Sequence, residues 1–231
     1  MGKKKEKQHK WIIRNYNWGK LVLELIVVFL GVTSGFLLNN WREQEQEKRI
    51  EQKYISSFIK DVADNISDLE SLTVADSLWL NTATPNLISL QNKSLIEDSA
   101  KLVISRVLQI NKMDSHSGTY EDITNSGNLN LIRNFDLKTN IVDYHLALKG
   151  VGFIDDHFYK YFNDFVMPFV FSEFNVLSGE FKNAEEINNM RFSNIFTGYY
   201  SMVQQRNSAY KDILLKSYKL KEELLLKSIE N

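Results

Sequence analysis

An uninterrupted apolar run near the N-terminus constrains this chain more than any other feature. Residues 21–38, LVLELIVVFLGVTSGFLL, contain a single ionisable side chain, Glu24. Eighteen residues of α-helix extend about 27 Å, close to the roughly 30 Å thickness of the hydrocarbon core of a bilayer. Trp18 and Trp41 flank the run, where aromatic side chains suit the two membrane interfaces. The alternative, a buried core helix of a soluble protein, does not explain these flanks, so we predict a transmembrane helix over residues 21–40.

The distribution of charge predicts how this helix is oriented. Residues 1–20 carry seven Lys or Arg and one Glu, a net charge of 7 − 1 = +6, whereas residues 21–231 carry 21 basic and 28 acidic side chains, a net charge of 21 − 28 = −7. Because Lys and Arg are in excess on the cytoplasmic side of membrane helices, residues 1–20 are expected in the cytoplasm and residues 41–231 in the periplasm. The basic arm is expected to bind anionic lipid headgroups, and the acidic remainder argues against nucleic acid as a partner.

A cleaved signal peptide is the competing interpretation of a basic arm followed by an apolar run. The run here ends in Leu-Leu-Asn-Asn-Trp at residues 37–41, which lacks the small-residue cleavage site typical of signal peptides. We therefore predict an uncleaved signal anchor that passes once through the inner (cytoplasmic) membrane.

The rest of the chain has the pattern of an all-α domain. It contains two prolines, and its apolar residues recur at the helical spacings of three and four. The clearest stripe follows the apolar run, with no Gly or Pro between Asn39 and Thr84, and predicts a long stalk helix that continues from the membrane. We expect residues 41–231 to form one helical bundle. The stripe consists of Ile50, Tyr54, Phe58, Val62, Ile66, Leu69 and Leu72.

Local signals predict where the stalk and the next helices begin and end. Pro85 is expected to end the stalk helix, because proline removes a backbone donor and clashes with the preceding turn. The stretch Ser94-Leu-Ile-Glu97 has the spacing of a capping box that would begin the next helix. Gly127 is then expected to close a short helix that begins near Thr119.

The C-terminal half carries similar signals. Asn134 is expected to cap a helix that ends at Gly150, and a further helix is expected to stop before Pro168. The fold of residues 169–183 is left open. A last long helix is predicted over residues 192–228.

Three stretches together give the chain a resemblance to a known family. They are ELIVVFLG at residues 24–31 followed by Asn39-Asn40-Trp41, EQKY at residues 51–54, and TYEDITNSGNLNLI at residues 119–132. The chain resembles a family of uncharacterised single-span proteins common in Bacteroidetes-type bacteria, which have an apolar N-terminal segment with one Glu and then a mostly helical domain. The resemblance implies the same location and architecture, and it implies no catalytic residue.

The third stretch has a structural and a functional interpretation. Its distinctive residues are Tyr120, Gly127, Asn128, Leu129 and Ile132. A short helix that closes on Gly127, followed by a tight reversal at Asn128, would bury Leu129, Leu131 and Ile132. The alternative is that these residues form a surface for a binding partner.

One face of the predicted membrane helix combines a carboxyl group with small residues. Glu24, Val28, Gly31 and Gly35 share this face, and Gly31 and Gly35 form a GxxxG motif. Small residues let helix backbones approach closely, and a polar side chain on the same face can hydrogen-bond across the contact. The face therefore predicts packing against a second copy or another membrane protein. The alternative is that Glu24 only extends toward the interface or pairs with Lys20.

The sequence offers no constellation for catalysis. The chain has no cysteine, and no nucleophile elbow, phosphate-binding glycine loop or H-E-x-x-H spacing occurs in it. Of the four histidines, His145 lies in an apolar helical pattern and is expected in the core or at its rim. We predict a protein that is not an enzyme and has no cofactor and no metal site.

Three functions remain to be compared. The leading prediction is an accessory or scaffold subunit of a membrane assembly, which associates through its span with itself or with another membrane protein. The second is a sensor-like bundle that binds a small ligand and works through a membrane partner, since about 20 cytoplasmic residues are too few for an output domain. A periplasmic hydrolase is the third, and it lacks a set of catalytic residues.

Overall fold

A computed structural model describes residues 18–230 of the chain, apart from the side chains of Glu186 and Glu230. Residues 1–17, which make up most of the predicted basic arm, lie outside the described part. The chain divides into two compact units, residues 1–49 and residues 50–231.

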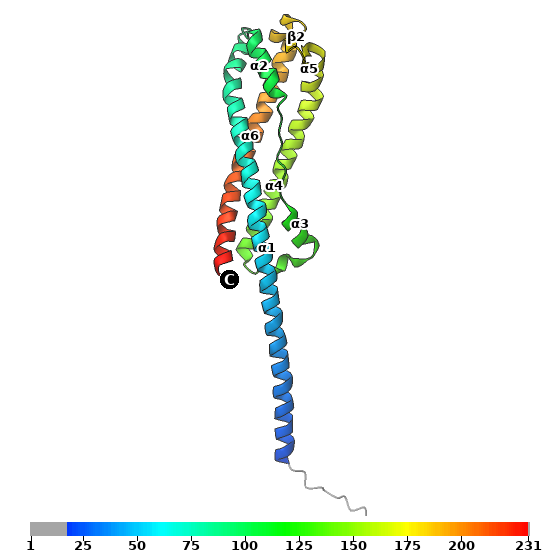
Figure 1. The fold of residues 1–231 in the computed structure, drawn as a ribbon, viewed down its shortest axis with the longest axis vertical. Helices are drawn as coiled ribbons and strands as arrows, with labels where there is room; N and C mark the ends of the chain where they lie inside the picture. The colour runs from blue at the N-terminus through cyan, green and yellow to red at the C-terminus, as the bar shows by residue number, and fades with distance from the viewer. Residues whose placement is uncertain (1–17, 231) are drawn as a thin grey trace, which may run out of the picture. The chain divides into compact units, whose positions relative to one another are not determined.

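The described residues are almost wholly helical, as predicted (Figure 1). A single antiparallel pair of two-residue strands, in which Phe174 lies opposite Phe181, is the only sheet in residues 18–230. The elements in chain order are α1 (Trp18–Gln91), α2 (Glu97–Val107), α3 (Gly118–Asn125), the 3-10 helix η1 (Asn128–Leu131), α4 (Phe135–Tyr161), the π-helical turn η2 (Phe162–Val166), α5 (Met167–Glu173), β1 (Phe174–Asn175), β2 (Glu180–Phe181), the 3-10 helix η3 (Ala184–Asn188) and α6 (Met190–Glu230).

The described part of the first unit, residues 18–49, is helical throughout and belongs to α1. Its apolar stretch is long and apolar enough to cross a membrane, and no residue of its most apolar 18-residue window is buried within the protein. A core helix of a soluble domain would bury this stretch. The predicted long apolar helix is therefore present, with its apolar side chains exposed.

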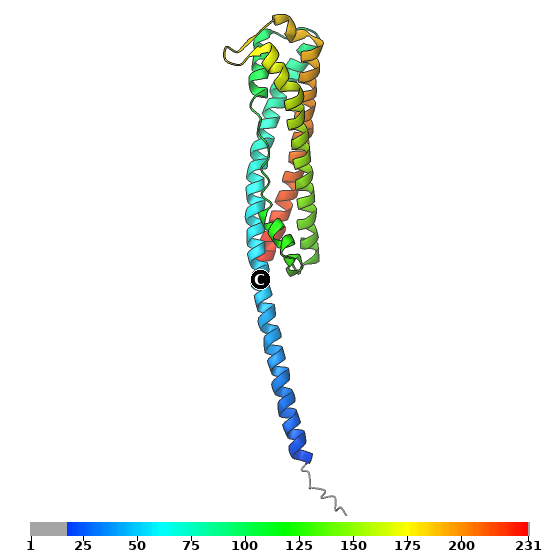
Figure 2. The same cartoon turned by 90° about the vertical axis from the view of Figure 1, so that its right-hand side faces the viewer.

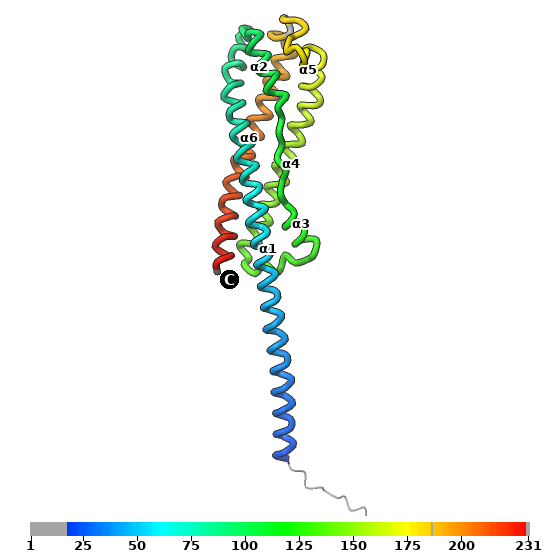
Figure 3. Tube along the Cα trace, in the orientation of Figure 1, coloured from blue at the N-terminus to red at the C-terminus, as the bar shows by residue number. Residues whose placement is uncertain are grey.

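The second unit is a bundle built on three long helices, the part of α1 from Ile50 onward, α4 and α6 (Figures 1 and 2). In this unit α1 and α4 run in the same direction and α6 runs in the opposite one. The helices α2 and α5 and the small hairpin lie at one end of the bundle, and α3 lies at the other. Residues 108–117, which connect α2 to α3, run in an extended path along the bundle (Figure 3). We call residues 108–117 the strap.

The core of the bundle consists of two apolar clusters. One lies at the end formed by α2, α5 and the hairpin, and it includes Ala83, Phe158 and Phe192. The other lies at the end near α3, and it includes Phe58 and Ile141. Each of the three long helices contributes to both clusters, so each also passes through the region of the bundle between the two clusters.

Two predicted helix boundaries near residue 90 are wrong. Helix α1 continues through Pro85 to Gln91, because Ala83 and Leu90 on either side of the proline are both buried in the first cluster. This burial outweighs the loss of one backbone hydrogen bond at the proline. The predicted capping box is also absent, since α2 begins after Ile96 without a side-chain cap, and the Ser94 hydroxyl donates to the Ser89 carbonyl instead.

Two further boundaries were predicted wrongly in the C-terminal half. Helix α4 continues through Gly150 to Tyr161, because Leu148 and Val151 keep the same buried face on both sides of the glycine. Pro168 does not terminate a helix either. It lies at the second position of α5, which follows the π-helical turn η2 directly, so the helical path continues through the proline.

Other local predictions are confirmed. Helix α3 ends before Gly127, which has a φ of 73° in the left-handed region that favours glycine. Asn134 caps α4 by accepting a hydrogen bond from the Leu137 backbone N–H at 3.0 Å. The last helix, α6, begins and ends within two residues of the predicted limits. Residues 169–183, left open by the sequence, form most of α5 and the hairpin.

Candidate functional site

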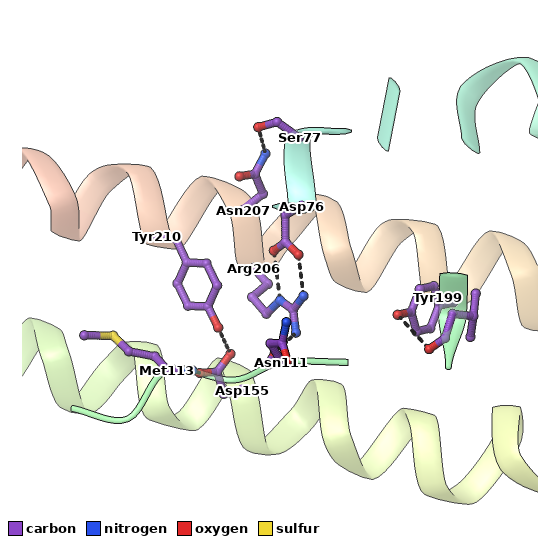
Figure 4. A network of polar contacts seen from close by, with 10 residues as sticks. Asp76, Ser77, Asn111, Met113, Asp155, Tyr199, Arg206, Asn207 and Tyr210 are labelled. Carbon is purple, nitrogen blue, oxygen red and sulfur yellow. Dashed lines mark hydrogen bonds and ion pairs between the residues drawn. The ribbon is translucent and has the colours of Figure 1, made fainter. Parts of the chain in front are cut away.

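A layer of polar side chains lies between the two apolar clusters of the bundle (Figure 4). Helix α1 contributes Asp76, α4 contributes Asp155, and α6 contributes Arg206 and Tyr210. All four side chains are buried. Each takes a position within the buried stripe of its helix, so the layer crosses the whole bundle.

Arg206 is the centre of this layer. Its Nε and Nη2 atoms donate to the two carboxylate oxygens of Asp76 at 3.0 and 2.5 Å, and Nη1 donates to the Asn111 carbonyl at 3.0 Å. The guanidinium also lies over the Phe158 ring, 3.9 Å from its centroid. The residue is only 4% exposed, and although burial opposes it, the Asp76 carboxylate raises the pKa of the guanidinium. Burial raises the pKa of Asp76, and the hydrogen bonds and charge of Arg206 oppose that shift, so the two side chains fix each other in one bidentate geometry.

Asp155 connects the layer to the strap. One of its carboxylate oxygens accepts from the Tyr210 hydroxyl at 2.5 Å, and the other accepts from the Met113 backbone N–H at 3.2 Å. Burial raises the pKa of Asp155, and these two hydrogen bonds oppose that shift. Because Arg206 binds the carbonyl of Asn111 and Asp155 binds the N–H of Met113, the strap is held from two helices at once.

Polar side chains of α1 hold the end of the strap that leads into α3. The Asn65 amide makes two hydrogen bonds with the backbone of His116, donating to its carbonyl at 3.0 Å and accepting from its N–H at 2.8 Å. Asp61 accepts from the Thr119 N–H at 2.9 Å, and Asp68 lies 3.3 Å from the His116 ring. An extended chain has no internal backbone partners, so these side chains satisfy groups that would otherwise be left unpaired.

The second and third stretches of the family resemblance meet in space. Tyr54 donates to Asp122 at 2.9 Å and accepts from the Asn128 amide at 3.3 Å. Glu51, which is 2% exposed, accepts from the Arg133 N–H at 2.9 Å. The two stretches therefore form one structural joint, in which α1 fixes the turn between α3 and α4.

The other distinctive residues of the third stretch also have structural roles. Ile132 is fully buried in the second cluster, and Leu129 is half-buried against it. Tyr120 stacks on His145, with ring centroids 4.1 Å apart and the rings nearly parallel at 16°. The predicted reversal after Gly127 is thus present and buries Ile132, whereas Leu129 and Leu131 are only half-buried.

His145 is in the core at its rim, as predicted. It is 7% exposed and lines a half-open pocket of about 520 Å³ beside α3, together with Ser117, Tyr120, Glu121 and Lys149. Burial lowers the pKa of His145 to about 4, so the imidazole is neutral at pH 7. Charged groups of both signs line this pocket.

A second half-open cavity, of about 240 Å³, lies directly against the polar layer. It is lined by residues of α1, α2, α6 and the strap. Asp76 and Arg206 form part of its wall, and Trp79, Arg106 and Tyr199 are among the other lining residues. The Tyr199 hydroxyl donates to the Val107 carbonyl, which ties α6 to the end of α2 (Figure 4). This cavity places two arginine side chains next to an aromatic wall.

The residues predicted for the membrane helix lie in the other unit. Glu24 and Val28 are exposed, and a Cβ atom added at Gly31 or Gly35 would meet no other atom of the described chain within 4 Å. Trp18 and Trp41 are also largely exposed, at 75% and 63%. This predicted face therefore has no neighbour within the described protein.

Two other histidines, His116 and His157, follow aspartates closely in the sequence, a pattern that can supply metal ligands. His116 is engaged with Asp68, and His157 packs edge-on against the Phe153 ring. Within residues 18–230, no group of three or more His, Asp or Glu side chains is placed to hold a metal ion.

Comparisons of the chain with protein-family models, curated proteins and solved structures found no match. The polar layer was missed by the sequence reasoning, although a signal for it exists. Asp76 falls four residues after Leu72 in the apolar stripe of α1, and Arg206 falls three residues after Val203 in that of α6. A charged residue in a buried stripe needs a partner, and these two charges are of opposite sign.

Proposed function

We propose that this chain is a single-pass protein of the inner membrane whose periplasmic helical bundle serves as an accessory or scaffold subunit of a membrane assembly. The observation that carries the proposal is the exposed apolar segment of α1, whose side chains are buried by nothing in the described chain. A surface of this size and apolarity needs a nonaqueous environment, and its length matches a bilayer.

The span is proposed to do more than anchor the protein. Glu24, Val28, Gly31 and Gly35 share one helical face, and no atom of the described chain lies against the two glycines. The glycines leave room for a second backbone, and Glu24 can hydrogen-bond across such a contact. The proposed neighbour is a second copy or another membrane protein.

The bundle itself supports a scaffold better than a catalyst. Its buried polar groups are used to fix the strap and the turn after α3 to α1, α4 and α6. The proposed orientation, with residues 1–20 in the cytoplasm, lets the basic arm bind anionic headgroups and leaves the acidic bundle outside. A sensor-like role through a membrane partner is the second candidate, and the cavity beside the polar layer favours it.

Site-directed photocrosslinking along the span tests this proposal, because it captures a second copy or another membrane protein alike. The chain has no native cysteine, so a single cysteine placed at each of residues 21–38 is a unique site on the chain for a photoreactive label. A packing face predicts that crosslinking peaks every three to four positions on the side of Glu24. The double substitution Gly31→Ile with Gly35→Ile adds apolar bulk, so it should preserve membrane insertion and abolish these peaks.

The control adds apolar bulk on the opposite face of the helix, with Ile26→Phe and Thr33→Phe. These substitutions should leave the crosslinking pattern in place. A profile that is flat along the span, or that is unchanged by the double glycine substitution, would show that the span is only an anchor.

A further inference from the structure

The cavity against the polar layer has the charge of a binding site for an anion. Two guanidinium groups and one carboxylate line it, a net charge of 2 − 1 = +1. Both carboxylate oxygens of Asp76 are already engaged by Arg206. The remaining positive charge in the wall is that of Arg106.

Arg106 is half-buried and lacks an ionic partner within the described chain. Its one hydrogen bond there runs from Nη1 to the Thr82 hydroxyl at 3.1 Å, and no carboxylate of residues 18–230 forms an ion pair with it. A guanidinium has five N–H donors in a planar fork, so about four remain to be used. The ligand that matches this fork best is a carboxylate, which accepts two parallel hydrogen bonds.

The rest of the wall is mostly aromatic and aliphatic, with two amide residues, Gln109 and Asn111. Trp79 is half-buried and packs edge-on against Tyr199, with ring centroids 5.0 Å apart. Both residues line the cavity, beside Leu72 and Val203. Its volume of about 240 Å³ exceeds the roughly 150 Å³ that suffices to bind benzene in an engineered apolar cavity. The cavity therefore accommodates an apolar or aromatic body as well as a charged group.

We propose that this cavity binds a small organic carboxylate, with the carboxylate on Arg106 and the apolar body against Trp79. The buried Asp76–Arg206 pair forms the floor and fixes the position of α6 against α1. The pocket beside His145 does not share this preference, because it carries Glu121 as well as Lys149 and so has no excess of positive charge. The proposal goes beyond the scaffold function and does not depend on it.

The fluorescence of Trp79 provides a direct probe of ligand binding in the cavity. Replacing Trp11, Trp18 and Trp41 with Phe leaves Trp79 as the one tryptophan of the full-length chain, which is then studied in lipid nanodiscs. Sodium benzoate should change Trp79 emission saturably, whereas benzamide, its uncharged analogue, should not. Arg106→Gln should weaken benzoate binding by about tenfold or more, since hydrogen bonds between charged groups are worth about 1.5–3 kcal/mol.

Two further variants distinguish a specific contact with Arg106 from a general effect of positive charge. Lys101→Gln removes one positive charge from the same helix without touching the cavity, and it should leave benzoate binding unchanged. Arg106→Lys keeps the charge and loses the fork, so its affinity should fall between those of the parent and Arg106→Gln. Thermal unfolding followed by circular dichroism should show stabilisation by benzoate in the parent and none in Arg106→Gln.

The proposal is overturned if benzoate leaves Trp79 emission unchanged, or if benzamide binds as tightly as benzoate. It is also overturned if Lys101→Gln weakens binding as much as Arg106→Gln, because the attraction would then be nonspecific. If Arg106→Gln does not fold, the comparison of benzoate with benzamide in the parent decides the outcome.

Discussion

Arg206 of α6 and Asp76 of α1, which are 130 residues apart in the sequence, form a bidentate ion pair. Both side chains are buried, and they sit between the two apolar clusters of the bundle. The pair sets the register of α6 against α1, because sliding either helix by one turn would leave a charge buried in an apolar cluster.

Breaking this pair should destabilise the bundle strongly. Arg206→Met leaves the Asp76 carboxylate buried without a partner, and the loss of one member of a buried pair costs about 3–5 kcal/mol. The double variant Asp76→Leu with Arg206→Met should be closer to the parent, because both charges are removed together. Urea unfolding of the full-length protein in detergent, followed by circular dichroism, measures these differences.

The exposed pair Lys160–Asp164 is the control for that experiment. Its members are 73% and 47% exposed, and Lys160→Met should leave the unfolding free energy unchanged within measurement. Equal losses for the buried and the exposed pair would contradict the register role given to Arg206.

The same substitution at two glycines should have opposite effects. Gly127→Ala forces a side chain into a left-handed backbone with a φ of 73°, which should cost about 1–2 kcal/mol. Gly150→Ala lies inside α4 with open space around the new methyl group, so it should stabilise the protein by about 0.5–1 kcal/mol. Denaturant midpoints of both variants provide the test, and equal signs would contradict the assigned backbone conformations.

His145 should make the stability of the bundle depend on pH. Its pKa is lowered from 6.5 to about 4 in the folded protein, so between these values the unfolded chain binds the proton and the folded chain does not. The unfolding free energy should therefore fall as pH decreases from about 6.5 toward 4, by up to about 1.4 kcal/mol per pH unit. Above pH 6.5 the contribution is constant.

His145→Phe isolates this contribution. Asp76 and Asp155 also have shifted pKa values, and they are present in both proteins, so their effects cancel in the difference. The variant should lose the extra slope between pH 4 and 6.5. Parallel stability curves for the two proteins would show that His145 titrates normally.

The sequence predicted the helices well where a long apolar stripe is undivided. The stripe from Ile50 to Leu72 forms the buried face of α1, and Asn134 caps α4 as its position suggests. The predicted helix ends were wrong where local backbone preference and tertiary packing compete. Pro85 and Gly150 both disfavour a helix locally, and the apolar side chains on either side of each keep the helix intact by burial.

The cavity beside the polar layer could not be predicted from the sequence for a different reason. The cavity is built from α1, α2, α6 and the strap, and no local pattern brings Arg106 near Trp79. The same holds for the joint between Tyr54 and Asp122, which are 68 residues apart. The stretches at residues 51–54 and 119–132 were recognised separately in the sequence, and the structure shows that they contact each other.

The proposed topology places the helical bundle outside the cytoplasm. It is tested by a reporter enzyme that is active only outside the cytoplasm, fused after Asn231 of the full-length chain. We predict an active reporter that stays with the membrane fraction after washing at alkaline pH, on a fusion protein of full length. An inactive reporter, or an active one released on a shortened soluble product, would contradict a signal anchor with a periplasmic bundle.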